Sequence, residues 1–317
     1  MLRIMCRKKT LAKIAYQYYI EGRSQNEIAA ELNVNRATIS RMLKEARDVN
    51  IVSIEVDCYD EKVLELESYL KQHFKLKNVI IASTLEPRST RNSEYLYEEA
   101  AEYIQTIIKN GNKVGVSWGK TISNVVHKVE KKQTKNVTFF PLAGGSSPAN
   151  IKYHVNSMVH EMGKKFSGQC RYINTQVVQE RKKSNKGIPN ETTDELLSLW
   201  DNLDIAIVGI GGTLKQKSPW REVLSTEDFD ELKLREAVGD CCCQFFDRDG
   251  KILKGQLYNR TISIPLEHLS KAKFSIGIAA NKNKAQAIFA MLKRQYINVL
   301  ITDYETALLV AEMAKDK

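Results

Sequence analysis

From about residue 77 onward, the sequence alternates between short apolar runs and longer amphipathic segments, and this alternation constrains the fold more than any other feature. Near-continuous apolar runs at 205–210 and 274–279 are typical of strands buried on both faces of a sheet. Helix-like segments follow several of these runs. Strands that alternate with helices predict an α/β, Rossmann-like fold with a mostly parallel sheet. We expect further strands at 79–81, 113–116, 137–142 and 297–302, and helices at 94–109, 121–131, 284–294 and 304–314.

Four of these strands are followed by loops rich in glycine or polar residues. Parallel strands bring their carboxyl ends to one edge of the sheet, where open α/β sheets bind ligands. Glycine lets backbone N–H groups approach a ligand closely, and a helix N-terminus attracts anions. We therefore expect a site for one phosphate or a cluster of sugar hydroxyls. The expected residues in the first three loops are Gly115, Gly119, Thr121, Gly144, Gly145 and Gly211.

The stretch VGVSWGKT at 114–121 resembles a nucleotide-binding P-loop at its end, but its spacing differs. The interval between Gly115 and Gly119 is one residue too short for the P-loop pattern, whose backbone wraps a chain of phosphates. A loop this short favours a smaller group. The alternative for each glycine loop taken alone is a simple turn.

Two charged residues near these loops are candidates for ligand contacts. Lys284 lies in the first turn of an expected helix, where a cation opposes the helix dipole, so an anionic partner is expected. Asp247, in the stretch GDCCCQFFDRDG at 239–250, is a candidate acceptor for ligand hydroxyls. Asp249-Gly250 is typical of a hairpin turn, so Asp249 is expected to be structural. For Lys284 the alternative is a solvated lysine.

The N-terminal segment predicts three short helices. Ser24 with Glu27 three residues later forms a capping box for the second helix, and Asn35 is placed to cap the third after a short turn. A tight turn before the third helix is typical of a helix-turn-helix. The alternating run 51–56 predicts the strand of a small wing.

The third helix carries the charge expected of a DNA reader. Between residues 35 and 47 there are four basic residues and one acidic residue, a net charge suited to phosphate-lined grooves. Arg36, Thr38 and Arg41 are expected to meet base edges, and Ser24, Gln25 and Lys44 to hold the DNA backbone. Ala37 and Ser40 share this surface. The alternative is a small helical bundle with a solvated basic face.

We expect three parts: a DNA-binding domain at 1–57, a connector at 58–76 and an effector domain at 77–317. The connector predicts an amphipathic helix with an apolar stripe that packs either on its own domain or on a second copy. We favour self-association, because DNA readers of this kind use two copies to span half-sites about 34 Å apart.

Composition narrows the function further. Lys and Arg exceed Asp and Glu by ten, 48 against 38, which favours a polyanionic partner. No apolar run is long enough for a membrane helix, and no signal peptide is evident, so we expect a cytoplasmic protein without a membrane partner. The run Cys241–Cys243 has no His or Cys at ligand spacing, so we expect reduced thiols in or beside a strand, no metal and no cofactor.

The chain resembles the SorC family of bacterial sugar-responsive transcription regulators. The resemblance covers nearly the whole sequence, in AAELNVNRATISRMLKEARDVNIVSIEV near the start and in VGVSWGKT, PLAGG, VGIGG, AVGDCCCQFFDRDG, NRTISIPL and NKNKAQAIFAMLKRQYINVLITDYETA behind it. It implies a DNA reader joined to an effector domain similar to sugar-phosphate isomerases, and a homodimer or homotetramer. It further implies that Gly119, Thr121, Gly144, Gly145, Asp247 and Lys284 surround a phosphorylated sugar or polyol.

Two positions depart from the family pattern. Some members carry a lysine that forms an imine with the sugar where this chain has Ala143, so covalent capture is not expected there. Members often have two glycines where this chain has Ala280 and Asn281, which alters the loop before Lys284.

The sequence therefore predicts a transcriptional regulator, more commonly a repressor, that binds double-stranded operator DNA and is controlled by a small phosphorylated effector. One alternative is an enzyme. Asp247 is the obvious candidate base for a sugar-phosphate isomerase, no second acid or base stands out, and the loop spacing disfavours a kinase. RNA binding is less favoured, because the third helix lacks the aromatic residues on which RNA bases stack.

Overall fold

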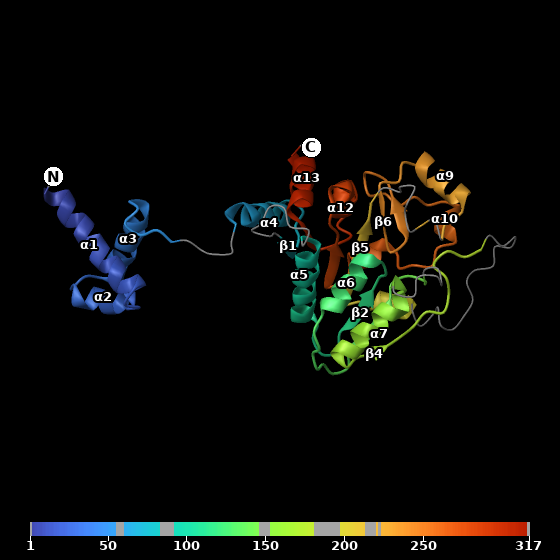
Figure 1. Cartoon of the computed structure of the whole chain (residues 1–317), viewed down its shortest axis with the longest axis horizontal. Helices are drawn as coiled ribbons and strands as arrows, with labels where there is room; N and C mark the ends of the chain where they lie inside the picture. The colour runs from blue at the N-terminus through green and yellow to red at the C-terminus, as the bar shows by residue number, and fades with distance from the viewer. Residues whose placement is uncertain are drawn as a thin grey trace. The chain divides into compact units, whose positions relative to one another are not determined.

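The computed structural model describes residues 2–54, 60–82, 92–145, 153–180, 197–212, 220 and 223–315. The chain divides into two compact units, Met1–Tyr59 and Asp60–Lys317 (Figure 1). The helix of the expected connector, α4 (Glu61–His73), belongs to the second unit. No helix in the described ranges is long and apolar enough to cross a membrane.

The first unit is the predicted helix-turn-helix, built from α1 (Leu2–Tyr19), α2 (Gln25–Glu31) and α3 (Arg36–Asp48). The predicted caps are present. Ser24 accepts a hydrogen bond from the backbone N–H of Glu27, whose carboxylate accepts one from the N–H of Ser24. The Asn35 side chain accepts from the N–H of Thr38 at 2.8 Å. A small shared core holds the helices together, formed by Leu11, Ile14, Ala15, Ile28, Ala29, Ile39, Leu43 and Ala46.

The expected wing strand is wrong over residues 51–54, which form no strand; residues 55 and 56 lie outside the described ranges. The N–H groups of Ile51 and Val52 both donate to the carbonyl of Ala46 near the end of α3. Their side chains are partly buried against the helical core. Ile51 and Val52 of the alternating run thus bond to the end of α3 and pack on the helical core, and they do not pair with another strand.

The second unit contains the predicted mostly parallel sheet, with strand order β1-β9-β8-β5-β2-β3-β4. All pairings along this path are parallel, and β6 and β7 extend it from β5 as an antiparallel hairpin. The strands are β1 (Asn78–Ala82), β2 (Lys113–Val116), β3 (Thr138–Pro141), β4 (Gln169–Cys170), β5 (Ile205–Gly211), β6 (Gly239–Cys241), β7 (Gln244–Phe246), β8 (Phe274–Ile278) and β9 (Val299–Asp303).

Helices cover both faces of this sheet. Successive side chains of β5 point to opposite faces, so Ile205 and Ile207 enter one core while Ala206 and Val208 enter the other. The first core also contains side chains of α5 (Asn92–Ile107), α6 (Lys120–Lys128) and α7 (Val155–Phe166). The second contains side chains of α4, α12 (Ala285–Lys293) and α13 (Tyr304–Lys315). The near-continuous apolar sequence of β5 follows from burial on both faces.

Helix α4 packs on its own unit, which is the less favoured of the two arrangements predicted for it. Its apolar stripe is covered, with Leu66 8%, Leu70 0% and Phe74 8% exposed. Glu67 on the same helix accepts a hydrogen bond from the backbone N–H of Ile81 in β1 at 2.8 Å. The apolar stripe is therefore buried within the chain, and little apolar surface remains on this helix to contact a second copy.

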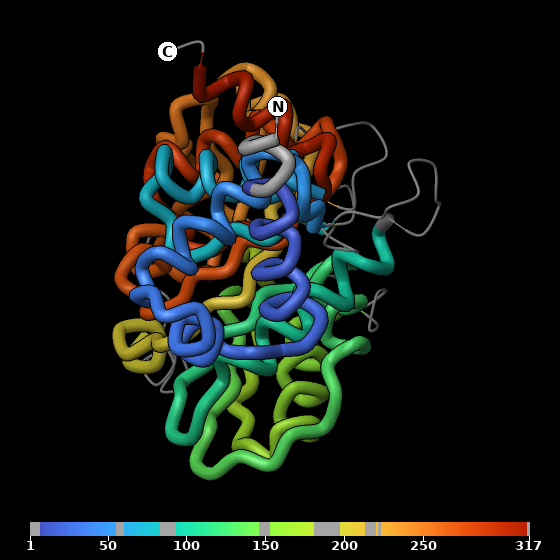
Figure 2. The backbone as a smooth tube through the Cα atoms, turned by 90° about the vertical axis from the view of Figure 1, so that its left-hand side faces the viewer, coloured from blue at the N-terminus to red at the C-terminus, as the bar shows by residue number. Residues whose placement is uncertain are grey.

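The direction in which successive strands are added to the sheet reverses at β5. From β2 the chain passes through α6 on one face to β3, and from β8 it passes through α12 on the other face to β9 on the opposite side of β5. In Figure 2 the green segment with α6 and α7 and the orange to red segment with α12 and α13 accordingly occupy opposite ends of this unit. Such a switch point opens a crevice at the carboxyl ends of the strands.

Four further short helices lie between β5 and β9 in the sequence. They are α9 (Thr226–Leu234), α10 (Gln256–Asn259), α11 (Leu266–Leu269) and the short 3-10 helix η3 (Lys282–Lys284). Of these four described helices, η3 contributes to the crevice at the switch point, because it joins β8 to α12.

Candidate functional site

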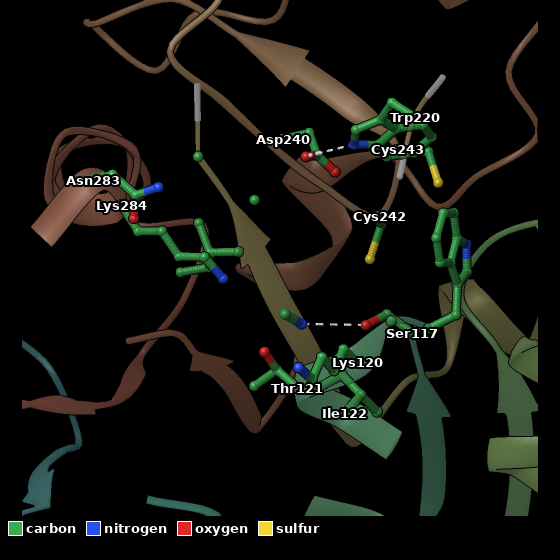
Figure 3. Close-up of a pocket in the computed structure, with 16 residues that line it drawn as sticks. Ser117, Lys120, Thr121, Ile122, Trp220, Asp240, Cys242, Cys243, Asn283 and Lys284 are labelled. Carbon is green, nitrogen blue, oxygen red and sulfur yellow. Dashed lines mark hydrogen bonds between the residues drawn. The ribbon is translucent and has the colours of Figure 1, made fainter. Parts of the chain in front are cut away.

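A cavity of about 390 Å³ lies at the switch point of the sheet (Figure 3). It is formed by the segments that follow β2, β5 and β8 and by the hairpin between β6 and β7. Its lining residues are Ser117, Trp118, Gly119, Lys120, Thr121, Ile122, Gly209, Ile210, Gly211, Gly212, Trp220, Asp240, Cys242, Cys243, Asn283 and Lys284. Three of the four predicted loops thus share one cavity.

The N-terminus of α6 opens into this cavity. Gly119 is the N-cap, with φ 118°, and has no side chain to cap the helix. The first bond of the helix runs from the N–H of Ser123 to the carbonyl of Gly119, so the preceding N–H groups of the first turn have no intrahelical acceptor. Lys120 and Thr121 of that turn both line the cavity. These N–H groups and the helix dipole favour an anion.

Lys284 brings a cation to the same cavity from η3, and Figure 3 shows its amine pointing into the space. Burial lowers the pKa of Lys284, and the nearby carboxylate of Asp240 partly offsets that effect. The preceding loop includes Asn281 at φ 96°, a left-handed conformation that favours glycine. The N–H of Asn281 donates to Asp303 at 2.8 Å. The chain thus reaches Lys284 through a residue other than glycine in this conformation.

Asp240 supplies a carboxylate that is 7% exposed. The indole N–H of Trp220 donates to it at 3.2 Å (Figure 3). Burial raises the pKa of Asp240 to about 6, against the opposing effects of the Trp220 hydrogen bond, the Lys284 charge and the backbone N–H of Cys243. Burial thus shifts Asp240 and Lys284 toward their neutral forms, since it outweighs their attraction across the cavity. A ligand that bonds to both groups would restore their lost solvation.

Two glycines at the end of β5, Gly211 and Gly212, make room for these charged groups. A Cβ atom on Gly211 would lie 1.9 Å from the Asp240 carboxylate. A Cβ atom on Gly212 would lie 2.9 Å from the carbonyl oxygen of Asn283 and 3.3 Å from the Lys284 side chain. The glycine pair therefore lets the hairpin and η3 approach the end of β5 closely.

Aromatic rings form one wall of the cavity. Trp118 and Trp220 meet edge to face with ring centroids 5.2 Å apart, and Trp220 meets Phe245 at the same distance. Trp118 follows β2 and Phe245 lies in β7, so the cluster joins two lining segments. A wall of this kind suits the C–H face of a sugar beside the polar groups opposite.

Four predicted effector residues come together in this cavity: Gly119, Thr121, Gly211 and Lys284. The other four do not line it. Gly115 lies within β2, where a Cβ atom would be 2.3 Å from Leu142. Gly144 packs against the backbone of Val177, and Gly145 against His154. At these three positions glycine serves close packing.

Asp247 is also placed away from the lining. One of its carboxylate oxygens accepts hydrogen bonds from the N–H groups of Asp249 and Lys251, each at 2.9 Å. It therefore closes the turn in which Gly250 has φ 73°. The neighbouring Asp249 pairs with Lys293 at 2.6 Å. The carboxylate in the cavity is Asp240, seven residues earlier in the same stretch.

Among the lining residues that were not predicted from the sequence are Asp240, Trp220, Cys242 and Cys243. A signal for Asp240 was present, since Gly239-Asp240 opens the stretch that also contains Asp247. What places it is the antiparallel pairing of Gly211 with Asp240, a contact between β5 and β6 that the mainly parallel pattern did not predict.

The first unit presents a basic surface on α3. Arg36, Ala37, Ser40, Arg41 and Lys44 are exposed, while Thr38 is half-buried. The Thr38 hydroxyl donates to Asn35 at 2.8 Å, so it helps to fix the helix start. On α2, Ser24 is exposed and Gln25 is half-buried. These predicted DNA contacts lie on α3 and at the N-terminal end of α2.

Glu45 is one of two acidic residues of α3, with Asp48 at the end of the helix, and its carboxylate is engaged within the unit. Its carboxylate receives two hydrogen bonds from Arg7 of α1, each at 2.8 Å. These bonds lower the pKa of Glu45 and raise that of Arg7. The remaining basic side chains of α3 are left to dominate its exposed face.

The described residues include no cluster of three or more His, Cys, Asp or Glu side chains that could hold a metal ion. In that part of the chain, Cys170, Cys241, Cys242 and Cys243 are free thiols.

Comparisons with known proteins agree with this two-part organisation. The family described as "Putative sugar-binding domain" matches residues 60–311. The sorbitol operon regulator of Klebsiella pneumoniae is 31% identical over 306 residues, covering 95% of this chain and 97% of that protein. The deoxyribonucleoside regulator of Bacillus subtilis is 29% identical over 291 residues, covering 92% and 93%.

Solved structures give the same result. The full-length sorbitol operon regulator SorC from Klebsiella pneumoniae matches with a TM-score of 0.73 and 30% identity, covering 96% of this chain and 98% of that one. A transcriptional regulator from Streptococcus pneumoniae matches with a TM-score of 0.75 and 38% identity, covering 80% and 98%. The similarity therefore extends over both units in the first case and over most of the chain in the second.

Proposed function

Since the chain belongs to the SorC family of transcriptional regulators, we propose that it binds operator DNA through α3 and is controlled by a small phosphorylated sugar or polyol held in the cavity at the switch point. Repression relieved by the effector is the proposed direction of control. A cytoplasmic location and assembly into a homodimer or homotetramer are part of this proposal, because two copies are needed to read two half-sites of an operator.

The observation that carries the proposal is the convergence of anion-binding features in one cavity. The open N-terminus of α6 and the amine of Lys284 face a common space of about 390 Å³. A phosphate group satisfies both at once, because it accepts hydrogen bonds from backbone N–H groups and compensates the partly desolvated cation.

The remaining groups in the cavity favour a sugar or polyol as the rest of the effector. Asp240 accepts hydrogen bonds and can take them from ligand hydroxyls in place of the long 3.2 Å bond from Trp220. The Trp118 and Trp220 rings offer an apolar face beside it. The volume of about 390 Å³ lies at the small end of ligand pockets and fits a monosaccharide phosphate better than a dinucleotide.

Control of DNA affinity requires that the effector bind two arrangements of the chain unequally. The cavity is bounded by segments from both halves of the sheet, those that follow β2 and those that follow β8. A ligand that contacts both halves favours the arrangement in which they close on it. We propose that this closure is the change transmitted to the DNA-binding units.

The rival function is sugar-phosphate isomerisation. Asp247, the base considered from the sequence, is held in a turn, whereas Asp240 has a pKa of about 6 and faces the cavity. A pKa near neutrality is what a general base requires. Turnover of sugar phosphates by the wild-type protein, abolished in Asp240→Asn, would establish the rival. We expect binding without turnover.

The direct test is a thermal-shift screen of the full chain against phosphorylated sugars and polyols and their unphosphorylated counterparts. A ligand that binds only the folded state raises the melting temperature, by an amount that grows with its concentration relative to Kd. We expect a rise with one or more phosphorylated compounds and a much smaller one with the matching unphosphorylated compound.

The matched variants are Lys284→Gln and Lys282→Gln. Both lysines lie in η3, but Lys282 pairs with Glu305 at 3.2 Å and does not line the cavity. We expect Lys284→Gln to lose the stabilisation by the phosphorylated compound and Lys282→Gln to keep it. Equal responses in the two variants would remove Lys284 from the site.

A further inference from the structure

The hairpin turn between β6 and β7 has a conformation that its residues disfavour. Cys241 pairs with Gln244 across the hairpin, which leaves Cys242 and Cys243 as a two-residue turn. Both have positive φ, 47° and 66°. Turns of this geometry favour Asn-Gly, because other side chains are strained in the left-handed region. The backbone conformation of this turn therefore does not explain why two consecutive cysteines occupy it.

The turn brings thiols to the wall of the candidate effector cavity. Cys242 and Cys243 both line the cavity, and Figure 3 shows the sulfur of Cys242 pointing into it. Both are buried, Cys242 in the main core of the unit and Cys243 in the aromatic cluster with Trp220 and Phe245. Cys241, at 0% exposure, lies in the core behind the turn. Of the three thiols, Cys242 thus has the most direct access to the cavity.

The two neighbouring thiols are held in their protonated form. A hydrogen bond with Cys242, together with burial, raises the pKa of Cys241. Burial, followed by the charge of Asp240, raises the pKa of Cys243. Because the thiolate is the reactive form of cysteine, both neighbours are expected to be poor nucleophiles at neutral pH.

We propose that Cys242 is a modification site inside the candidate effector cavity, where it forms a mixed disulfide with a small, negatively charged disulfide-type reagent. The Cys242 sulfur attacks one sulfur of the reagent, whose S–S bond breaks. The other half departs as a thiolate, or as a sulfinate from a thiosulfonate, and the proton that Cys242 loses passes to the thiolate or to solvent, so that Cys242 is oxidised and the departing half is reduced. The adduct occupies the space of the effector, and this last step alone rests on the proposed function.

The charge preference follows from the cavity lining. The amine of Lys284 and the open N-terminus of α6 face the same space as the Cys242 sulfur (Figure 3). These groups attract an anionic reagent and repel a cationic one. Asp240 opposes them, and because burial raises its pKa to about 6, its negative charge weakens as the pH falls toward that value.

The test uses two methanethiosulfonates that differ in the charge they carry, one with a sulfonate and one with a trimethylammonium group. Each transfers its thiol half to a cysteine and releases methanesulfinate. The native full chain is labelled briefly, digested and mapped by fragment-ion mass spectrometry. We expect Cys242 to be labelled at least about tenfold faster than Cys241 or Cys243. The sulfonate should also be favoured at Cys242, relative to the rates of the two reagents with free cysteine.

Matched variants assign the reaction to the cavity. Cys242→Ser should lose the label from the hairpin, and Cys243→Ser should keep it. Lys284→Gln should weaken the preference for the sulfonate, whereas Lys282→Gln should preserve it. If Cys242 stays unlabelled in the native chain but reacts after unfolding, the proposal is wrong. It is also wrong if the two reagents react at Cys242 in the same ratio as with free cysteine.

Inorganic phosphate separates this proposal from the proposed function. If phosphate occupies the same cavity, it should slow labelling of Cys242 by the sulfonate. If the sulfonate reagent is favoured at Cys242 but phosphate gives no protection, the modification site at Cys242 is supported. That result would contradict only the proposal that phosphate binds in the same cavity.

Discussion

At the scale of single residues, the cavity is characterised by one acidic and one basic side chain whose charged forms are both disfavoured by burial. Asp240 has a raised pKa and Lys284 a lowered one, and in each case burial is the largest cause. Nearby glycines allow this close approach, with Gly211 beside Asp240 and Gly212 beside Lys284. The site is thus costly to form when empty, and a ligand that bonds to both charges recovers part of that cost.

The pKa of Asp240 predicts a specific pH dependence. The pKa is about 6 in the folded chain, against a model-peptide value of 3.8, so the folded state binds the proton more tightly. The free energy of unfolding should therefore fall as pH rises between these two values, by on the order of 3 kcal/mol. Asp240→Asn should remove this fall. Thermal melts across this pH range measure it, with the exposed Glu305→Gln as control; an unchanged pH profile in Asp240→Asn would contradict the assignment.

Gly211 and Gly209 form a matched pair for testing the geometry. A Cβ atom on Gly211 would overlap the Asp240 carboxylate, whereas on Gly209 it would meet Ile122 at an ordinary 3.7 Å. Gly211→Ala should displace Asp240 and abolish stabilisation by the effector, while Gly209→Ala should leave most of it. Thermal shift with the compound found in the screen provides the measurement. A normal response in Gly211→Ala would show that the position of Asp240 is unimportant for binding.

The sequence could identify the glycine loops but could not separate their roles. Gly119 and Gly211 line the cavity, whereas Gly115 and Gly144 make room for Leu142 and for the backbone of Val177. Both roles place a glycine near the end of a strand, so local sequence does not distinguish them. Asp247 was predicted and Asp240 was missed, because the contact that places Asp240 joins two strands that are distant in sequence.

At the scale of elements, the parts that were predicted best are those set by local interactions. The capping box of Ser24 and the Asn35 cap involve residues three apart, and both form as expected. The wing pattern at 51–54 failed because two N–H groups bond to Ala46 at the end of α3. Alternation alone does not supply a partner strand.

Arg41 tests the proposed DNA-reading face of α3. If Arg41 contacts a base edge, Arg41→Ala should weaken operator binding by about 1–3 kcal/mol and relax specificity at one position. If Lys44 contacts a DNA phosphate, Lys44→Ala should instead weaken binding to all sequences alike and reduce the salt dependence. Fluorescence anisotropy titrations on operator and random duplexes at two salt concentrations separate these effects. Unchanged affinity in Arg41→Ala would exclude Arg41 from the interface.

Helix α4 offers a test of packing within the chain. Leu70 is 0% exposed and Leu64, on the same helix, is 39% exposed. Leu70→Ala should lower the free energy of unfolding of the second unit by about 2–5 kcal/mol, and Leu64→Ala by much less. Urea unfolding measures both, and sedimentation measures the assembly state. If Leu70→Ala changed the assembly state without changing stability, the stripe would be an interface between copies.

At the scale of the whole molecule, the order of strands and helices predicted the parallel sheet, and the sheet predicted the edge at which the cavity lies. The hairpin β6–β7 was not predicted, because its strands are only three residues long and contain the run of cysteines. That hairpin carries Asp240 and Cys242 into the cavity, so a short antiparallel addition to a parallel sheet completes the site.

The central claim is that an anion bound at the switch point changes the affinity of the chain for DNA. The most direct measurement is the Kd of the full chain for an operator fragment selected from random duplexes, with and without the phosphorylated compound found in the screen. We predict a change of about tenfold or more in the wild-type chain, equivalent to at least about 1.4 kcal/mol of coupling. Lys284→Gln should lose the change and keep the DNA affinity of the unliganded chain. An operator affinity that is identical with and without the bound compound in the wild-type chain would contradict the claim.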